Sequence, residues 1–546
     1  MQMTKSYQAD VVIAGGGLAG IVTACELLDH GCRVLLIDKD RRERFGGLAK
    51  ESFGGVHFVA TVHQKRLGIK DSPELAYRDW LSFASFGEND RWPMAWAKAY
   101  CENSIEYIYN FLDARKIKFL PIVNWAERGL FMPGNSVPRW HIAWGTGAEI
   151  IRRLVGALEN HPKRSNLALL FDHEVNGVDS TGGRVCGVSG KELASGLEFR
   201  AQGEVVIASG GICGGDLGKV RDNWWPQWGP APKVMLNGAH IYGDGLLHDK
   251  VAALGANITH LDKQWHYAAG VNHPARRKPF DGLSLVPPRS ALWMNALGER
   301  IGPMPLMGYT DTRSLVESIV AQPGGYSWQI LNWKIAAKEL AVSGAVYMSA
   351  FVKKSRKMLL KQAVFGNNEL VERLLSECPK DFVSAASLPE LAEKMNQRSL
   401  FGLRVDLARM KNDITSYDEM IERGKAFYND EQLQRIAAHR NYLGDRIRTC
   451  KFQKILDPRA RPLIAIREFI LSRKSLGGIQ TDLRCRVLDR QGAPIGGLYA
   501  VGEAAGFGGG GIHGLRSLEG TFLGSCVLTG RIAGKAIGGG KDVTTS

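Results

Sequence analysis

One stretch near the start of the chain constrains its fold more than any other: residues 10–38 read DVVIAGGGLAGIVTACELLDHGCRVLLID. The apolar run 11–14 predicts a buried strand, Gly15-x-Gly17-x-x-Gly20 predicts a tight turn into a helix, and a second strand follows. In such a unit the glycines let a pyrophosphate approach the helix N-terminus, and an acid after the second strand binds ribose hydroxyls. The segment predicts a dinucleotide site with Asp38 as that acid.

The pattern itself leaves FAD and NAD open, and two further observations favour FAD. The complete unit of strand, glycine turn, helix, second strand and acid occurs once in the chain, whereas a flavin reductase that uses a nicotinamide usually needs a second one. The CxxxxC pair of disulfide reductases is missing as well.

Composition narrows the class of protein. A chain of 546 residues exceeds what one hydrophobic core supports, so at least two domains are expected. The net charge of +15 comes with no nucleic-acid-binding signature, and we interpret it as solvated surface charge. The nine cysteines lie far apart, which argues against metal sites and disulfides and indicates reduced thiols. With no signal peptide and no long apolar run, we expect a soluble cytoplasmic protein.

The chain resembles the fumarate reductase and succinate dehydrogenase flavoprotein superfamily along nearly its whole length. Within that superfamily it is most similar to the FAD-binding dehydrogenases near the 3-ketosteroid 1-dehydrogenases, through NSVPRWHIAWGTG (135–147) and FGGGGIHGLRSLEGTFLGSCVLTGR (507–531). The other segments that carry the resemblance are FGGLAKESFGG (45–55), FDHEVNGV (171–178), VVIASGGICGG (205–215), GAHIYGDGLLHDKVAALGA (238–256), QWHYA (264–268), WMNALGERI (293–301), SLGGIQTD (475–482) and GGLYAVGEAAG (496–506).

This resemblance implies an α/β fold in which a Rossmann-like FAD-binding domain is formed from both chain ends, with an inserted α+β capping domain. The expected ranges are 1–267 and 441–546 for the FAD-binding domain and 268–440 for the capping or substrate domain. The residue pattern agrees, because glycine thins in the middle of the chain and helical periodicity takes over, as in SWQILNWKIAAKEL (327–340) and LPELAEKMNQ (388–397).

The resemblance also implies which residues hold FAD. Some relatives attach their flavin to a histidine, but Leu48 occupies that position here, so noncovalent FAD is expected. The residues implied to contact the cofactor are Gly15, Gly17, Leu18, Ala19, Gly20, Asp38, Lys39, Gly46, Gly47, Leu48, Gly54, Gly55, Val175, Ser209, Gly210, Gly502, Glu503, Leu518 and Thr521. No metal site is expected.

Four residues are candidates for catalysis, each with an ordinary structural role as its alternative. His266 matches a family histidine that faces the substrate, and Tyr309 lies where the ketosteroid enzymes carry an active-site tyrosine. His513 and Arg516 follow a run of four glycines, 508–511, which would let backbone amides approach the flavin and place both side chains at the pocket rim.

The resemblance breaks down at the residues that hold dicarboxylates. Ser517 stands where the substrate-binding arginine is expected, Pro287 falls near the position of a catalytic arginine, and Lys474 replaces a histidine. Two carboxylates need several charge-assisted contacts, so fumarate and succinate are not expected as substrates.

The leading hypothesis is an FAD-dependent dehydrogenase that desaturates a carbon–carbon bond next to a ketone, like a 3-ketosteroid dehydrogenase, with hydride passing to the flavin. Its partners would be a small apolar ketone and an external electron acceptor, namely a quinone, an electron carrier or oxygen. One alternative is a flavin-dependent enoate reductase or oxidase that acts on a polar or carboxylated substrate through His266, Arg289 and Arg516. The other is a non-catalytic flavin-binding protein. The oligomeric state is not indicated.

One segment, AVYMSAFVKKSRKML (345–359), combines apolar and basic residues. It predicts either a solvated helix of the capping domain or a peripheral contact with an acidic membrane.

Overall fold

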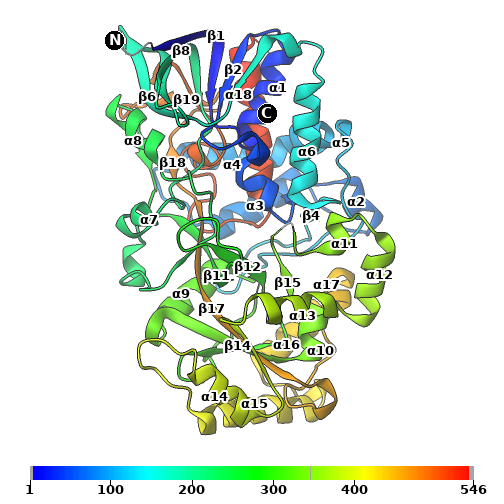
Figure 1. Ribbon diagram of the computed structural model, residues 1–546. Coiled ribbons are helices and arrows are strands. Elements are labelled where there is room, and N and C mark those ends of the chain that lie inside the picture. Colours follow the sequence, from blue (N-terminus) through cyan, green and yellow to red (C-terminus); the bar gives the residue numbers. More distant parts are fainter. Residues whose placement is uncertain (1–3, 309, 345, 540–546) are drawn as a thin grey trace. The chain divides into compact units, whose positions relative to one another are not determined.

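The computed structural model describes residues 4–308, 310–344 and 346–539, and it divides into two compact units. Unit 1 comprises Met1–Trp224, Ala239–Trp265 and Lys474–Ser546, and unit 2 comprises Trp225–Gly238 and His266–Arg473 (Figure 1). Unit 2 continues past residue 440, the boundary expected from the sequence, because the long strand β17 (Leu463–Ser475) belongs to its sheet.

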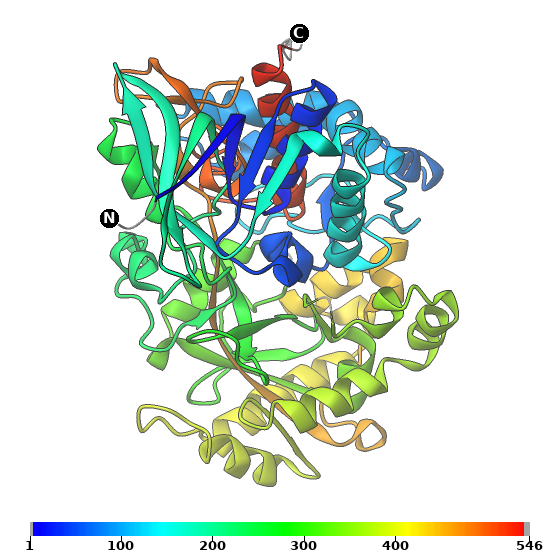
Figure 2. The same ribbon diagram turned by 45° about the horizontal axis from the view of Figure 1, so that its top comes forward.

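Unit 1 is built on a largely parallel sheet. Strands β20, β8, β1, β2 and β5 lie side by side in that order, all parallel, while β19 pairs antiparallel with β20, and β6 and β7 form a meander on β8 (Figure 2). The bounds are β1 (Lys5–Ala14), β2 (Val34–Ile37), β5 (Leu167–Leu170), β6 (His173–Thr181), β7 (Arg184–Glu192), β8 (Glu198–Ile207), β19 (Arg486–Leu488) and β20 (Pro494–Ala500). This is the Rossmann-like sheet that the glycine fingerprint predicts.

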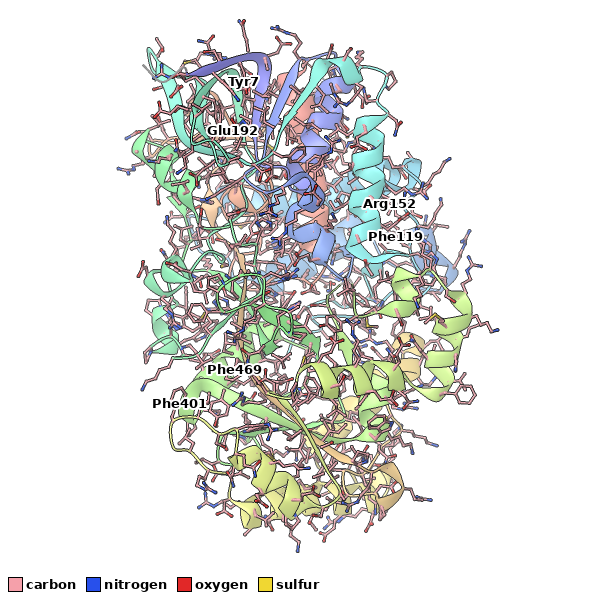
Figure 3. All side chains as sticks on the ribbon, viewed as in Figure 1. Tyr7, Phe119, Arg152, Glu192, Phe401 and Phe469 are labelled. Atoms are coloured by element: carbon pink, nitrogen blue, oxygen red, sulfur yellow. The ribbon has the colours of Figure 1, made fainter. Side chains whose placement is uncertain are left out.

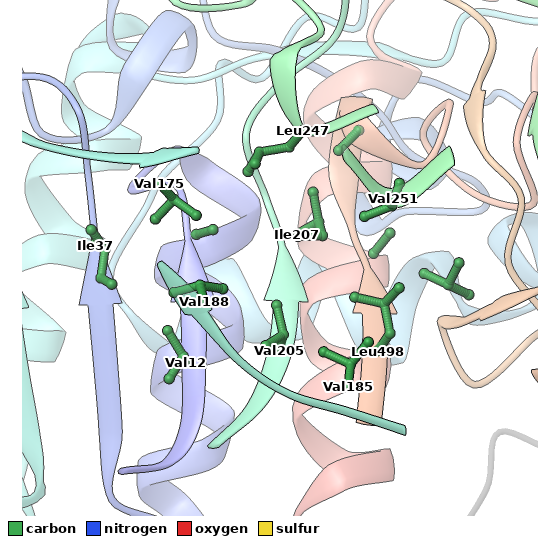
Figure 4. Close-up of a cluster of buried hydrophobic side chains, with 14 of the residues drawn as sticks. Val12, Ile37, Val175, Val185, Val188, Val205, Ile207, Leu247, Val251 and Leu498 are labelled. Carbon is green, nitrogen blue, oxygen red and sulfur yellow. The ribbon is translucent and has the colours of Figure 1, made fainter. Parts of the chain in front are cut away.

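The core of unit 1 joins segments that are far apart in the sequence. Val12 of β1, Val205 of β8 and Leu498 of β20 belong to one buried cluster (Figure 4). Leu247 and Val251 of helix α8 (Leu246–Ala253), in the middle segment of unit 1, pack into the same cluster. Burial of branched side chains from parallel neighbours therefore fixes the central part of the sheet.

Helix α1 (Leu18–Asp29), which follows the glycine turn, packs against the late helix α18 (Thr521–Ile537). A Cβ atom added at Gly530 would lie 2.8 Å from the carbonyl oxygen of Ala19, and one at Gly534 would lie 2.4 Å from the Cβ of Glu26. Larger residues at these two positions would force the helices apart, so the glycines of α18 set their close approach.

The remaining elements of unit 1 surround this core. They are β3 (Gly55–His57), β4 (Trp140–Ile142), β10 (Ile258–Thr259), β18 (Gly478–Ile479), α2 (Val62–Arg66), α3 (Pro73–Ala84), α4 (Arg91–Asn103), α5 (Asn110–Ala114), α6 (Thr146–Glu159), α7 (Gly218–Asp222) and α8 (Leu246–Ala253).

Unit 2 has its own sheet, in the order β13-β14-β17-β11-β12-β15, with β16 and β9 also pairing with β17. The strands are β9 (Leu236–Asn237), β11 (Gln264–Asn272), β12 (Gly282–Val286), β13 (Leu292–Asn295), β14 (Tyr326–Asn332), β15 (Ala341–Val342) and β16 (Phe382–Ala385). Its helices are α9 (Thr312–Val320), α10 (Trp333–Glu339), α11 (Ser349–Val352), α12 (Arg356–Phe365), α13 (Asn368–Glu377), α14 (Leu388–Asn396), α15 (Leu407–Glu422), α16 (Glu431–His439) and α17 (Leu443–Arg448).

The helix predicted over 327–340 is wrong in its first half. Tyr326–Asn332 forms strand β14, which pairs with β17 from Tyr326↔Phe469 to Asn332↔Leu463, and only then does α10 begin. Phe469 is labelled in Figure 3, and its ring lies 5.9 Å from that of Tyr326. A continuous buried run fits either a strand or a helix, and pairing with β17 decides between them. The helix predicted at 388–397 is confirmed as α14.

None of the helices in the described part of the chain is both long enough and apolar enough to cross a membrane.

Candidate active site

The glycines of the turn between β1 and α1 differ in what surrounds them. Gly15 has φ +119°, and a Cβ there would lie 2.3 Å from the carbonyl oxygen of Ala208, while a Cβ at Gly20 would lie 2.1 Å from that of Gly15. A Cβ at Gly17 would meet no described protein atom within 4 Å, and Gly17 caps α1 without a side-chain hydrogen bond. The protein excludes side chains at Gly15 and Gly20, whereas the space at Gly17 is open.

Asp38, directly after β2, ties this turn together. Its Oδ2 atom accepts a hydrogen bond from the backbone nitrogen of Gly16 at 2.6 Å, and its Oδ1 atom accepts one from that of Asp40 at 2.7 Å. Burial raises the pKa of Asp38. The carboxylate therefore holds the turn in shape, and its contact with a ribose stays a prediction.

Lys39 lies next to Asp38 and is paired within the protein. Its Nζ atom lies 2.5 Å from the Oε1 atom of Glu174 on β6 and 4.7 Å from the centre of the Tyr242 ring. This pair anchors the start of β6, where Val175 is buried. The predicted adenine side of the site is thus built from neighbouring elements of unit 1.

The loop after β2 meets the glycine turn directly. Gly46 forms a parallel bridge with Gly17, and a Cβ at Gly46 would lie 2.3 Å from Ile151 of α6. Further along, a Cβ at Gly55 would lie 1.7 Å from the indole nitrogen of Trp140. Leu48 is half-buried in the short turn between them. Glycines in this loop therefore permit close packing on α6 and β4.

The remaining residues predicted to contact FAD include several from the last segment of unit 1. Gly502 donates its backbone N–H to the Oγ1 atom of Thr529 at 3.0 Å, and Glu503 accepts one from the backbone of Ser475 at 2.9 Å. Thr521, at the start of α18, donates to the carbonyl of Leu518 at 2.6 Å. Ser209 and Gly210 lie in the loop after β8 of the same unit, one residue beyond the end of the strand. All the residues predicted to contact FAD thus belong to unit 1.

The glycine run 508–511 is closely packed by residues of unit 1 itself. Gly508 has φ +138°, and a Cβ there would lie 2.9 Å from the Trp96 ring. A Cβ at Gly510 would lie 2.2 Å from the Oγ1 atom of Thr259. Close packing against α4 and β10 gives these glycines a structural reason, and the approach of their backbone amides to the flavin stays a prediction.

His513 lies inside unit 1 with no accessible surface. Its ring stacks on Trp80 at 5.7 Å and packs against Phe507 at 5.3 Å and Phe522 at 4.9 Å. Burial, together with the charge of Lys474, holds the pKa of His513 well below its usual range, so the ring is neutral. The predicted position at a pocket rim is not what the described residues show, and a role toward substrate stays a prediction.

The two arginines proposed to bind a carboxylated substrate differ in their surroundings. Arg516 is half-buried in unit 1 and donates to the Oγ atom of Ser85 at 3.2 Å. Arg289 is buried in unit 2, where its NH1 atom lies 2.6 Å from Asp445 and 3.2 Å from the Thr449 hydroxyl. Its charge is therefore balanced within the fold, which argues against its role in the alternative hypothesis.

His266 and Arg313 form a buried pair of candidates in unit 2. The Arg313 guanidinium lies 4.7 Å from the ring centre of Trp225 and 4.4 Å from that of Trp228. Burial and the Arg313 charge lower the pKa of His266 to about 3, so its imidazole is neutral. A buried cation beside a neutral imidazole is suited to hold a carbonyl oxygen or an anion.

Arg313 is not among the candidates that the sequence indicates. The only local signal is the short polar run TDTRS (310–314) at the start of α9, and a charged residue there usually faces solvent. Tyr309, the other candidate in this region, lies outside the described residues.

Comparison with known proteins decides the family. The family model described as an FAD binding domain matches residues 10–523. The chain belongs to this family. This flavoprotein is therefore an FAD-dependent oxidoreductase with a mixed α/β fold of that class, and the resemblance inferred from its motifs is confirmed.

Close relatives of the flavoprotein cover nearly its whole length. It is 39% identical to a KsdD-like steroid dehydrogenase of Mycobacterium tuberculosis over 99% of this chain and 97% of that protein. It is 40% identical to one of Mycolicibacterium smegmatis over 94% and 96%. In structure it resembles 3-ketosteroid Δ4-(5α)-dehydrogenase from Rhodococcus jostii, with a TM-score of 0.65 and 19% identity over 98% of this chain and 100% of that one.

The residues present fit FAD. The open space at Gly17 lies at the uncapped N-terminus of α1, where backbone N–H groups and the helix dipole favour phosphate. Lys39 adds a cation to the same unit, and its neighbours Glu174 and Val175 lie on β6. Bound there, FAD supplies the acceptor for a hydride.

We expect the flavoprotein to release its FAD when it is denatured. Leu48, at the position of the covalent histidine of some relatives, offers no nucleophile for a bond to the flavin. Acid precipitation should therefore leave a yellow supernatant and a colourless pellet. Flavin colour that stays with the precipitated protein would contradict the expectation.

The flavoprotein should lose stability as the pH falls below about 6.5. Burial lowers the pKa of His141 to about 3 and of His248 to about 4, and it holds that of His57 well below the usual range. Since these histidines bind protons in the unfolded chain near pH 6.5, stability is full above that pH and declines below it. Each contributes up to about 1.4 kcal/mol per pH unit.

Thermal unfolding at pH 7.5, 6.0 and 5.0 measures this slope. His141→Gln should reduce the dependence of stability on pH, because it removes a group that binds a proton in the unfolded chain but not in the folded one. In the fold, the Nδ1 atom of His141 donates to the Arg139 carbonyl at 2.7 Å, and its Nε2 atom lies 2.9 Å from the Thr61 hydroxyl. Exposed His30, replaced by Gln, is the matched control and should leave the slope unchanged. Equal midpoints at all three pH values would refute the prediction.

Proposed function

We propose that this flavoprotein desaturates a carbon–carbon bond next to a ketone in a small apolar substrate, as a 3-ketosteroid dehydrogenase does. The observation that carries the proposal is its similarity to KsdD-like steroid dehydrogenases, at 39% identity over 99% of the chain. Electrons would leave to an external acceptor, namely a quinone, an electron carrier or oxygen. Nine free cysteines favour a reducing location such as the cytoplasm.

In this proposal the two units have separate tasks. Unit 1 would be the FAD-binding domain, since it contains all the residues predicted to contact FAD and has the parallel sheet that such a site needs. Unit 2 would be the capping domain that supplies substrate contacts, and it contains His266 and Arg313.

The residues of unit 2 would act on the ketone. Arg313 donates hydrogen bonds to the ketone oxygen and stabilises the negative charge that develops there as the neighbouring carbon loses a proton. His266, neutral at physiological pH, supplies a second donor to the same oxygen. We assign the proton transfer to Tyr309, whose phenolate would accept the proton from that carbon.

A second function is favoured by one observation. The same buried Arg313, held against Trp225 and Trp228, would also hold a carboxylate, which suits reduction of an unsaturated acid. Arg289 is paired with Asp445. This pair weakens the second candidate function, because a carboxylated substrate would need several cations.

An anaerobic titration tests the proposed function. The purified flavoprotein is mixed with a 3-ketosteroid that has a saturated ring A, and the flavin absorbance near the visible maximum is followed. We expect bleaching, and none with the matching 3-hydroxysteroid, which lacks the carbonyl. In a second arm the dithionite-reduced protein receives fumarate or a larger enoate. Saturable reoxidation by these acids, without bleaching by the ketone, would establish the second function instead.

A further inference from the structure

The segment from Val346 to Phe365 exposes a set of large apolar side chains on unit 2. Leu360 is 68% exposed, and Val364 and Phe365 are each 71% exposed. Val346 and Val352, just before α12, are also exposed. None of the residues of α12 is buried, although it is an ordinary helix of ten residues. This much apolar surface on one short segment is unusual for a protein surface in water.

The exposed residues of α12 lie on one side of the helix. Positions four apart share a face, so Arg356, Leu360 and Val364 form one outward stripe, and Lys357, Lys361 and Phe365 form the neighbouring one. The opposite side is attached to unit 2, because the Nζ atom of Lys338 on α10 donates to the Ala363 carbonyl at 2.7 Å. Figure 1 shows α12 at the periphery of unit 2. The helix therefore presents a fixed outward face.

Charge on this face is of one sign. Between Val346 and Phe365 the sequence has no aspartate or glutamate. It has exposed lysines and an arginine beside the apolar side chains: Lys353, Lys354, Arg356, Lys357 and Lys361. We call the outward residues the α12 surface, namely Val346, Val352, Lys353, Lys354, Arg356, Lys357, Leu360, Lys361, Val364 and Phe365.

We propose that the α12 surface docks the protein on a lipid bilayer that contains anionic headgroups. Leu360, Val364 and Phe365 would enter the boundary between headgroups and acyl chains, while the cations bind lipid phosphates. Apolar and basic residues interleaved on one helix face suit this environment, since both kinds of side chain find their partner at the same depth.

Charge argues against a second copy of the chain as the occupant. Two α12 surfaces facing each other would bring like charges together, and the whole chain carries a net charge of +15. An acidic protein would satisfy the lysines, but it would bury few apolar side chains at a charged contact. The bilayer interface offers partners for both the cations and the apolar side chains, and binding there needs no transmembrane segment. The proposal is independent of the proposed function.

Vesicle flotation of the FAD-loaded protein tests the proposal. We expect wild type to float with vesicles of phosphatidylcholine and phosphatidylglycerol at 3:1, to float poorly with phosphatidylcholine alone, and to be released by high salt. The double variant K361E/F365S should bind the anionic vesicles at least about tenfold more weakly, because it reverses one charge and removes one buried ring.

The matched control is K425E/F427S, which makes the same chemical changes elsewhere on unit 2. Phe427 is 71% exposed, as Phe365 is, and Lys425 is exposed beside it. This variant should bind like wild type. Equal binding by K361E/F365S and wild type, or equal flotation with neutral and anionic vesicles, would overturn the proposal. Size-exclusion chromatography adds a further arm: a dimer of wild type that K361E/F365S converts to a monomer, without vesicle binding, would assign the surface to self-association instead.

Discussion

Replacing Gly17 by valine should weaken FAD binding strongly while the apoprotein still folds. The position has φ −74°, which suits any residue, and an added Cβ meets no described protein atom within 4 Å. The new side chain would instead fill the space at the N-terminus of α1 that the pyrophosphate needs. We expect FAD to bind about 100-fold more weakly, near the upper cost of forcing a side chain into occupied space, about 3 kcal/mol.

Gly20→Val is the matched control for this result. A Cβ at Gly20 would lie 2.1 Å from the Gly15 carbonyl oxygen, so this variant should lose folding as well as FAD. Gly17→Val should cost only about 1 kcal/mol, because valine is a poorer helix N-cap than glycine. Flavin content after purification, fluorescence titration of apoprotein with FAD, and circular dichroism separate the two outcomes. A Gly17→Val protein that purifies yellow with normal affinity would show that the cofactor lies elsewhere.

Replacing Arg313 by alanine should lower kcat/KM for the ketone by about 100-fold to 1000-fold, the usual loss when a donor to a developing oxyanion is removed. The effect follows from the burial of Arg313, because a charge in an interior site acts with little screening by water. Arg313→Lys keeps the charge and should restore part of the activity. Stopped-flow bleaching of the flavin under anaerobic conditions measures the chemical step directly.

Arg289→Lys is the matched control in the same unit. Arg289 is buried to a similar degree, and Asp445 and Thr449 contact its guanidinium, so its replacement should change stability more than kinetic constants. FAD content should stay normal in all three variants, since the residues predicted to hold the cofactor lie in unit 1. Similar kinetic losses in Arg313→Ala and Arg289→Lys would mean that Arg313 acts only through the packing of unit 2.

The sequence predicts the strand, turn and helix of the glycine fingerprint well, because the signals for them are local. The strand, turn and helix around Gly15 need only neighbouring residues, and the structure has them as β1 and α1. Asp38 follows β2 as expected. What the sequence does not show is that both of its oxygens already accept backbone N–H groups.

The parts that depend on distant partners could not be predicted. The run 326–332 is buried throughout, and only pairing with β17, far along the chain, makes it a strand. His513 has the same dependence, since its surroundings come from α3 and α18. The sequence does not indicate Arg313 as a candidate, because the tryptophans that contact it belong to a separate segment of unit 2.

The packing of α1 against α18 has a consequence for synthesis of the protein. Domains generally fold as units during translation, with early segments first. Here α1, whose N-terminus would receive the phosphates, cannot bury its face until Thr521–Ile537 has left the ribosome. Unit 2 is complete earlier, at Arg473. Unit 2 can thus become compact on the nascent chain while unit 1 waits, and FAD would be captured only after α18 has emerged.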